Sequence, residues 1–405
     1  MIPRQAALQL QALAQWYPVV AVTGPRQSGK TTLVQATFPD KPYVPLEDPD
    51  VRESALSDPR RFLGQFAGGA ILDEAQRAPE LFSYLQTIVD RDRAMGAWVL
   101  TGSQQLGLRS EISQSLAGRV GLLELLPFTL GELQAANLPF TSIEDMLWRG
   151  LYPVPLDRGI PPGIWLADYF TTYVERDVRQ MLNVRDLQTF RTFVRMCAAR
   201  TSQVLNLSSL AADCGISNPT AKGWLSILEA SYLVFLLPPH HVNFGKQLTK
   251  SPKLYFYDTG LAAWLAGVRS AEELALSSLR GPLFETWAVA EAVKINLHLR
   301  LDARLFFWRD KIGSEVDLLV EHGSQLRTVE FKAGQTVAGD WFGSLRKYAA
   351  LRQTAASAAP APAQPEPGGR PMLVYAGSQP QVRDVADVCP WREWPEQALK
   401  LQQNK

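Results

Sequence analysis

Short apolar runs alternate with helix-like patterns through the first third of the chain. Residues 19–22 (VVAV), 69–72 (GAIL) and 98–103 (WVLTGS) predict buried strands, and residues 41–46 (KPYVPL) predict another. Apolar residues at helical spacing occupy residues 3–16, and residues 58–66 also have a helical pattern. Strands that alternate with helices indicate an α/β fold with a largely parallel sheet.

The middle of the chain has a different pattern. Residues 206–228 (NLSSLAADCGISNPTAKGWLSIL) predict a helix, a turn at Gly215 and a second helix capped by Ser217. Two strands, 232–238 and 253–257, follow this helix-turn-helix and predict a winged helix. They are joined by a basic loop that carries Lys246 and Lys250. A helical segment, 166–200, precedes it and is rich in arginine: Arg176, Arg179, Arg185, Arg191, Arg195 and Arg200.

The last third begins with a predicted helix, LFETWAVAEAVK from residue 283, and continues with strands at 306–308, 315–320 and 328–332. The turn HGSQ makes the last two strands a hairpin. Residues 355–369 (AASAAPAPAQPEPGG) have low complexity and predict a disordered or extended surface loop before a further strand at 371–375.

Length and composition set the limits of the interpretation. A chain of 405 residues is expected to form two or three domains, which we place at 1–150, 151–270 and 271–405. The formal net charge of +1 means that any binding to nucleic acid must depend on a local patch. The three cysteines are far apart and suggest neither a zinc site nor disulfides. Without a signal-like segment or a long apolar run, we expect a cytoplasmic protein that does not enter a membrane.

The clearest chemical motif follows the first predicted strand. Gly24-Pro25-Arg26-Gln27-Ser28-Gly29-Lys30-Thr31 matches G-x-x-x-x-G-K-[ST] in full, and Thr32 continues it. Glycines allow the tight turn in which successive N–H groups face a phosphate. Lys30 is expected to reach the β- and γ-phosphates of ATP, and the Thr31 hydroxyl to bind Mg²⁺.

A second motif completes the predicted phosphate site. Asp73 and Glu74 end an apolar strand, so we expect Asp73 to hold Mg²⁺ through water and Glu74 to polarise the attacking water. Ser103 ends the next strand and is a candidate γ-phosphate sensor, although a hydroxyl there also caps helices. Arg119 is a candidate arginine finger for a neighbouring subunit, which would require a homo-oligomer. The alternative for Arg119 is a surface salt bridge.

Four segments together carry a family resemblance: GPRQSGKTTL, AILDEAQ, VLTGSQ and LAGRVGLLELLPFTLGE. They resemble a prokaryotic family of AAA-type P-loop ATPases in which the ATPase domain precedes a conjoined domain of unknown function. The resemblance extends over nearly the whole chain. It implies a RecA-like α/β ATPase core but says little about physiological role, because most members are known only as predicted ATP-binding proteins.

The last domain contains a possible second catalytic group. Asp317 lies across the hairpin from Glu330 and Lys332, which share one face of their strand. Two carboxylates could bind Mg²⁺, and Lys332 could orient the water that attacks a phosphodiester. This arrangement resembles the PD-(D/E)xK core of restriction-endonuclease-like folds, with Glu285 as the helical acid. Val316 departs from the motif at the proline. The alternative is a hairpin whose charges pair with one another.

Two functions remain open from the sequence. In the first, ATP hydrolysis drives a winged helix and a nuclease-like domain that act on nucleic acid. In the second, ATP gates a binding switch with an inactive nuclease-like domain and a protein partner. Asn218, Thr220 and Lys222 are the exposed candidates for DNA contact on the second helix of the winged helix, but such modules also serve as structural lids or protein-binding surfaces.

Overall fold

A parallel sheet organises the first third of the computed structural model, which describes residues 2–103, 115–174, 186–240, 250–358, 366–367 and 369–403. Within these residues its strand order is β2-β3-β4-β1-β5. The strands are β1 (Val19–Thr23), β2 (Tyr43–Pro45), β3 (Ile71–Asp73), β4 (Trp98–Gly102) and β5 (Val120–Glu124). Every pairing between them is parallel. The predicted α/β sheet is therefore present.

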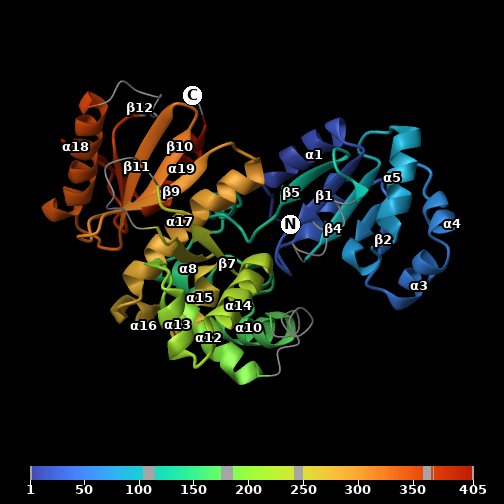
Figure 1. Ribbon diagram of the computed structural model, residues 1–405, viewed down its shortest axis with the longest axis horizontal. Helices are drawn as coiled ribbons and strands as arrows, with labels where there is room; N and C mark the ends of the chain where they lie inside the picture. The colour runs from blue at the N-terminus through green and yellow to red at the C-terminus, as the bar shows by residue number, and fades with distance from the viewer. Residues whose placement is uncertain are drawn as a thin grey trace.

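Helices cover both faces of this sheet (Figure 1). They are α1 (Ala6–Trp16), α2 (Lys30–Thr37), α3 (Pro49–Ser57), α4 (Pro59–Gly64), the short η1 (Ala75–Arg77) and α5 (Leu81–Asp92). Val20 and Val22 pack with α1 and α2, whereas Val19 and Ala21 pack with α5 on the other face. A strand buried on both sides is apolar at every position, which explains the continuous run in the sequence.

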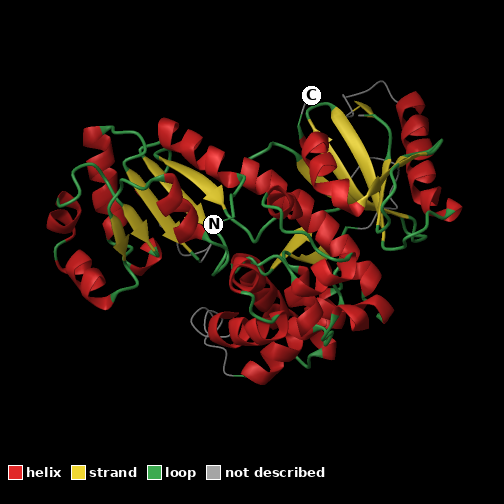
Figure 2. Cartoon of the chain, turned by 180° about the vertical axis from the view of Figure 1, so that it is seen from behind, coloured by secondary structure: helices red, strands yellow, loops and turns green. Residues whose placement is uncertain are grey.

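The middle lobe consists of a small antiparallel sheet with short helices gathered around it (Figure 2). The helices are α7 (Leu130–Ala135), α8 (Ile143–Arg149), α9 (Pro153–Arg158), α10 (Pro162–Tyr169), a π-helical turn η2 (Phe170–Val174), α12 (Leu187–Ala199), α13 (Leu207–Asp213), α14 (Asn218–Ala230), α15 (Thr259–Leu265) and α16 (Ala271–Leu276). The strands are β6 (Gln203–Val204), β7 (Val234–Leu237) and β8 (Lys253–Phe256), in the order β6-β8-β7.

The predicted turn between the helices α13 and α14 is present. Gly215 follows α13 with a φ of 65°, and the Ser217 hydroxyl caps α14 by accepting from the Thr220 N–H at 3.2 Å. The described parts of the arginine-rich segment lie in α10, η2 and α12. Arg176, Arg179, Arg185 and Lys246 lie outside the described residues.

The last lobe is a mixed sheet of order β14-β15-β13-β11-β10-β9, with β12 paired to β11. Its strands are β9 (Arg304–Arg309), β10 (Glu315–His322), β11 (Gln325–Lys332), β12 (Glu366–Pro367), β13 (Met372–Tyr375), β14 (Gln381–Val382) and β15 (Asp387–Pro390). Its helices are α17 (Arg280–Leu299), η3 (Gly339–Phe342), α18 (Gly343–Ala358), η4 (Trp391–Glu393) and α19 (Trp394–Gln402). The predicted loop at 355–369 was partly wrong, because α18 continues to Ala358. Residues 359–365 and 368 lie outside the described part.

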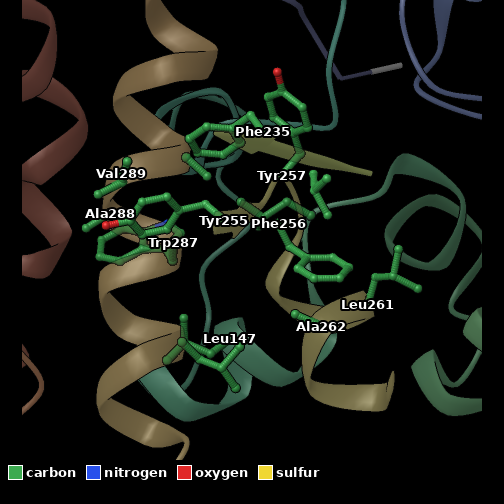
Figure 3. Close-up of a cluster of buried hydrophobic side chains, with 14 of the residues drawn as sticks. Leu147, Phe235, Tyr255, Phe256, Tyr257, Leu261, Ala262, Trp287, Ala288 and Val289 are labelled. Atoms are coloured by element: carbon green, nitrogen blue, oxygen red, sulfur yellow. The ribbon is translucent and has the colours of Figure 1, made fainter. Parts of the chain in front are cut away.

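The helix α17 is the central element of the molecule and lies between the lobes (Figure 1). Its buried residues lie on several sides, which is typical of a core helix. Figure 3 shows Trp287, Ala288 and Val289 of α17 in the same cluster as Phe235 of β7 and Tyr255 of β8. The middle and last lobes therefore share one hydrophobic core. No helix in the described ranges has the length and apolarity that a membrane crossing requires.

Candidate functional site

The phosphate-loop motif forms the connection between β1 and α2. Gly24 has a φ of 149°, and a Cβ there would lie 2.0 Å from the Leu125 carbonyl oxygen, so no side chain fits. Gly29 has a φ of 91° and precedes the first residue of α2 without a side-chain cap. The first N–H groups of α2 have no partner within the helix, and they carry its positive dipole end. The loop therefore has the backbone that an anion site needs.

Lys30 is held close to this loop. Its side chain is buried, and Nζ donates to the carbonyl oxygens of Gly24 at 3.0 Å and Pro25 at 2.8 Å. Both of these acceptors are neutral carbonyl groups of the loop itself. An ammonium on a loop that faces a cavity can exchange such carbonyl bonds for phosphate oxygens.

Asp73 and Glu74 stand where β3 ends, beside the loop. Thr31 Oγ1 donates to Asp73 Oδ1 at 2.9 Å, and the Tyr43 hydroxyl donates to Asp73 Oδ2 at 2.8 Å. Burial, followed by the hydrogen bond to Asp73, raises the pKa of Tyr43 well above its usual range, so this hydroxyl stays a donor. Thr101 also donates to Asp73. Hydroxyl groups thus position this carboxylate without neutralising it.

Glu74 is oriented by its backbone and by Ser103. Its φ of 54° is left-handed, and its N–H donates to Thr101 Oγ1 at 3.1 Å. The hydroxyl of Ser103 donates to Glu74 Oε2 at 3.0 Å. Ser103, which the sequence suggested as a phosphate sensor, therefore contacts the predicted base directly.

A cavity of about 960 Å³ opens beside these residues. Glu74 lines this cavity, together with six residues of the phosphate-loop motif: Arg26, Gln27, Gly29, Lys30, Thr31 and Thr32. The opposite wall comes from the chain before α1 and from α9, including Arg4 and Arg158. Gly24, Pro25, Ser28, Asp73 and Ser103 lie behind the lining. The volume is at the upper end of the range for small-molecule pockets.

Arg119 lies apart from this cavity, immediately before β5. Its Nε is 2.5 Å from Asp90 Oδ1, and the pair is exposed. The hydrogen bond from Arg119 lowers the pKa of Asp90. The salt bridge that was the alternative interpretation is present, and a role of Arg119 in a neighbouring subunit stays a prediction.

The sequence analysis missed Arg4, which connects the loop to the rest of the molecule. Its guanidinium donates to the Ser28 carbonyl oxygen at 2.8 Å, to the Leu126 carbonyl oxygen at 2.6 Å and to Glu132 Oε1 at 3.1 Å. Burial alone would raise the pKa of Glu132, but Arg4 and the backbone N–H groups of Thr129 and Gln5 outweigh it and lower that pKa. No motif surrounds Arg4. Tyr43 was also missed and could have been found, because polar residues at the carboxyl ends of parallel strands converge.

The last lobe brings most of the predicted nuclease-like residues together. Oxygen atoms of Glu285, Glu315 and Asp317 lie within 4.8 Å of one another. Asp317 Oδ2 accepts from the Phe331 N–H at 2.8 Å, and Lys332 Nζ donates to Glu330 Oε1 at 2.6 Å. Burial and then the charge of Glu330 raise the pKa of Asp317 well above its usual range. Burial raises the pKa of Glu330 to about 7, with Lys332 acting in the opposite direction.

Lys253 of β8 enters this cluster from the middle lobe, which the sequence did not suggest. Its Nζ lies 2.6 Å from Glu285 Oε1, contacts Glu315 Oε1 and is 4.0 Å from Asp317 Oδ1. The Tyr255 hydroxyl also donates to Glu285 Oε1 at 2.6 Å. Burial alone would lower the pKa of Lys253, but Glu285, Asp317 and Glu315 outweigh it and raise that pKa. Glu315 is likewise an addition to the predicted set.

The candidate nucleic-acid contacts of the middle lobe are spread over its surface. Asn218 and Lys222 are exposed on α14, whereas Thr220 is half-buried and its hydroxyl bonds with Ser217 Oγ at 2.8 Å. Arg191 and Arg195 lie on α12, and Arg200 pairs with Asp213.

Three family descriptions match successive parts of the chain. Residues 17–134 match an AAA domain, residues 140–272 match a domain of unknown function (DUF8612), and residues 280–394 match a second domain of unknown function (DUF4143). The predicted AAA-type domain and the conjoined domain of unknown function are thereby confirmed.

The chain is also similar to two relatives and, more distantly, to solved structures. Uncharacterised proteins of Mycobacterium bovis and Mycobacterium tuberculosis are each 32% identical over 345 residues, covering 82% of this chain and 74% of theirs. A Walker-type ATPase of Pyrococcus abyssi is similar in structure, with 15% identity, a TM-score of 0.44, and coverage of 65% of this chain and 96% of that one. DnaA of Aquifex aeolicus with bound AMPPCP has 13% identity and a TM-score of 0.30, covering 55% of this chain and 85% of its own.

Proposed function

The chain belongs to the family of these two mycobacterial proteins, and we propose that its first lobe binds ATP with Mg²⁺ and hydrolyses it. The observation that carries the proposal is the convergence of two motifs on one cavity. Lys30, Thr31 and Glu74 line that cavity, and Asp73 is hydrogen-bonded to Thr31 at 2.9 Å. The match of residues 17–134 to an AAA domain supports the same conclusion.

The donor set beside the loop suits Mg²⁺. The Thr31 hydroxyl and the Asp73 carboxylate offer hard oxygen ligands on adjacent positions, which is what this ion prefers. Bound there, Mg²⁺ would offset negative charge on the phosphates. Lys30 and the N–H groups at the start of α2 bind the phosphate oxygens, and Glu74 accepts a hydrogen bond from the attacking water. Ser103 holds Glu74 in the orientation for that task.

The other two lobes suggest what hydrolysis serves. The succession α12-β6-α13-α14-β7-β8 supports our proposal of a winged helix, and α17-β9-β10-β11-α18-β13 supports that of a restriction-endonuclease-like domain. We therefore propose that ATP turnover is coupled to action on nucleic acid, with DNA as the partner. In a homo-oligomer, Arg119 would reach the γ-phosphate of the adjacent subunit after leaving Asp90.

Coupling has direct routes from the phosphate loop to the middle lobe. Thr23 Oγ1, at the end of β1, bonds with the Tyr232 hydroxyl at 2.8 Å. Trp165 of α10 donates its indole N–H to Gln27 Oε1 at 3.1 Å. Gln27 belongs to the phosphate loop and Thr23 directly precedes it. A conformational change of the loop on nucleotide binding would therefore alter its contacts with the middle lobe.

A second candidate function is a nucleotide-gated switch that binds a protein partner, with Asp317, Glu330 and Lys332 taking no part in cleavage. The observation that favours it is the pairing of Lys253 with two carboxylates of the nuclease-like cluster. Charges neutralised by the protein itself are typical of a structural contact.

ATP turnover with and without duplex DNA tests the proposal and separates the two functions. Turnover that rises with DNA and is lost in Lys30→Ala and Glu74→Gln would support a nucleic-acid-dependent ATPase. Tight ATP binding with negligible turnover under both conditions would support the switch. Absence of ATP binding to the folded wild-type chain would overturn both.

A further inference from the structure

Three carboxylates from two elements meet at a single buried point in the last lobe. Glu285 comes from α17, and Glu315 and Asp317 come from β10, one strand period apart. Their oxygen atoms lie within 4.8 Å of one another. Three carboxylates at this spacing repel one another strongly in a poorly hydrated place unless a cation lies between them.

The cation in this structure is a side chain of the chain itself. Lys253 has only 1% of its side chain exposed, and its Nζ contacts Glu285 and Glu315 and lies 4.0 Å from Asp317. The ammonium has the position and the ligands that a bound divalent ion would have.

The strand that carries Lys253 is fixed by packing. Tyr255 stacks on Phe235 at a centroid distance of 5.4 Å, and its hydroxyl donates to Glu285. Figure 3 shows Tyr255 and Phe235 in the same cluster as Trp287 of α17. Withdrawal of Lys253 from the cluster therefore requires β8 to move relative to α17.

One further observation indicates that the cluster can accept an additional ligand. Glu330 is buried, and its Oε2 has no hydrogen-bond partner within the described part of the chain. Its other oxygen accepts from Lys332 at 2.6 Å. A buried carboxylate oxygen without a donor is costly, and a bound cation or water would satisfy it.

We propose that Lys253 is the resident cation of the Glu285–Glu315–Asp317 cluster, and that it competes with divalent metal ions for these three carboxylates. With β8 docked, the cluster joins the middle and last lobes and excludes metal. A metal ion enters only when β8 withdraws. This proposal concerns metal binding alone and does not depend on ATP hydrolysis in the first lobe.

The test is a titration of the full chain with Mn²⁺, without nucleotide, in which electron paramagnetic resonance counts bound ions. Lys253→Met should bind one more Mn²⁺ per chain than the wild type, and the added Asp317→Asn substitution should abolish this gain. Lys347→Met is the matched control, because Lys347 pairs with Asp310 outside the cluster, and it should bind as the wild type does.

If Lys253→Met does not fold, a comparison of the wild type with Asp317→Asn still tests the proposal. Wild type and Asp317→Asn should bind the same number of Mn²⁺ ions, because Lys253 already occupies the cluster. A Mn²⁺ ion that binds the wild type and is lost in Asp317→Asn would show that lysine and metal are held together, which would overturn the proposal.

Discussion

The phosphate loop and the cluster around Lys253 contain the same kinds of residue but hold them in opposite ways. In the loop, Lys30 donates to neutral carbonyl oxygens, and Asp73 accepts from the hydroxyls of Thr31 and Tyr43. In the last lobe, Lys253 binds directly to carboxylates, and Lys332 binds to Glu330. The contacts named in the loop are to carbonyl and hydroxyl groups, whereas those in the last lobe join ammonium groups to carboxylates.

This difference separates a site prepared for a ligand from a contact that stabilises the fold. A group that must bind phosphate or metal has to be held by partners that the ligand can replace or complement, and neutral dipoles meet this requirement. A buried lysine among carboxylates is instead costly to disrupt, because removal of one partner leaves the others uncompensated. The comparison can be tested by changing one residue at a time in each place.

The largest effect is expected at Glu74. Glu74→Gln keeps the shape of the side chain but removes the base, so ATP turnover should fall about 1,000-fold while nucleotide binding persists. Steady-state phosphate release and binding of a fluorescent ATP analogue measure the two quantities. Glu53→Gln makes the same chemical change at an exposed residue of α3 away from the cavity and serves as the control, with turnover of the same order as the wild type. Equal loss of binding and turnover in Glu74→Gln would contradict the role of Glu74 as a base.

The free energy of unfolding should fall more when Lys253 is replaced than when Lys30 is replaced. Lys253→Met leaves Glu285 without its cation and Glu315 with only Arg309, and it should reduce the free energy of unfolding by about 3 kcal/mol. Lys30→Met removes hydrogen bonds to the Gly24 and Pro25 carbonyl oxygens and should reduce it by less. Urea unfolding followed by tryptophan fluorescence measures both. If the two variants lost the same stability, the distinction between the two places would fail.

The side chain of His298 extends the comparison to the pH dependence of stability. His298 of α17 is fully buried, and desolvation lowers its pKa to about 3. Its Nε2 accepts from the Leu126 N–H at 3.0 Å, so the folded state holds the neutral ring. The unfolded state takes up a proton near pH 6.5, and the folded state does not until far lower pH. Stability is therefore lost as pH falls below 6.5.

The His298 effect is measured against His298→Gln, which cancels the other titrating groups. Between pH 6.5 and pH 5, the wild type should lose about 2 kcal/mol more stability than this variant. Unfolding by urea at the two pH values gives the difference. A wild type that became relatively more stable at pH 5 would show that the ring is protonated in the folded chain.

The sequence predicted that the two phosphate-site motifs would lie together, because their information is local. Gly24 to Thr31 are consecutive, and Asp73 and Glu74 end a recognisable strand, so the sheet alone brings them together. Lys253 could not be found in this way. It is separated from Glu285 by 32 residues and belongs to another lobe, and only packing of β8 on α17 reveals the pair. Arg4 and Glu132, 128 residues apart, show the same limit.

The smallest expected effect concerns the contact between the first two lobes. Tyr232→Phe removes the hydroxyl that bonds with Thr23 Oγ1 at 2.8 Å, and Thr23→Val removes the other partner. Both side chains are buried, so each single change should reduce stability by about 1 kcal/mol or somewhat more. Because both changes remove one shared bond, the double variant should lose less than the sum, with a coupling energy of about 1 kcal/mol. Strictly additive losses would mean that the bond contributes nothing to the connection. A coupling energy that changed when ATP is bound would instead show that this buried pair transmits the state of the phosphate loop to the middle lobe.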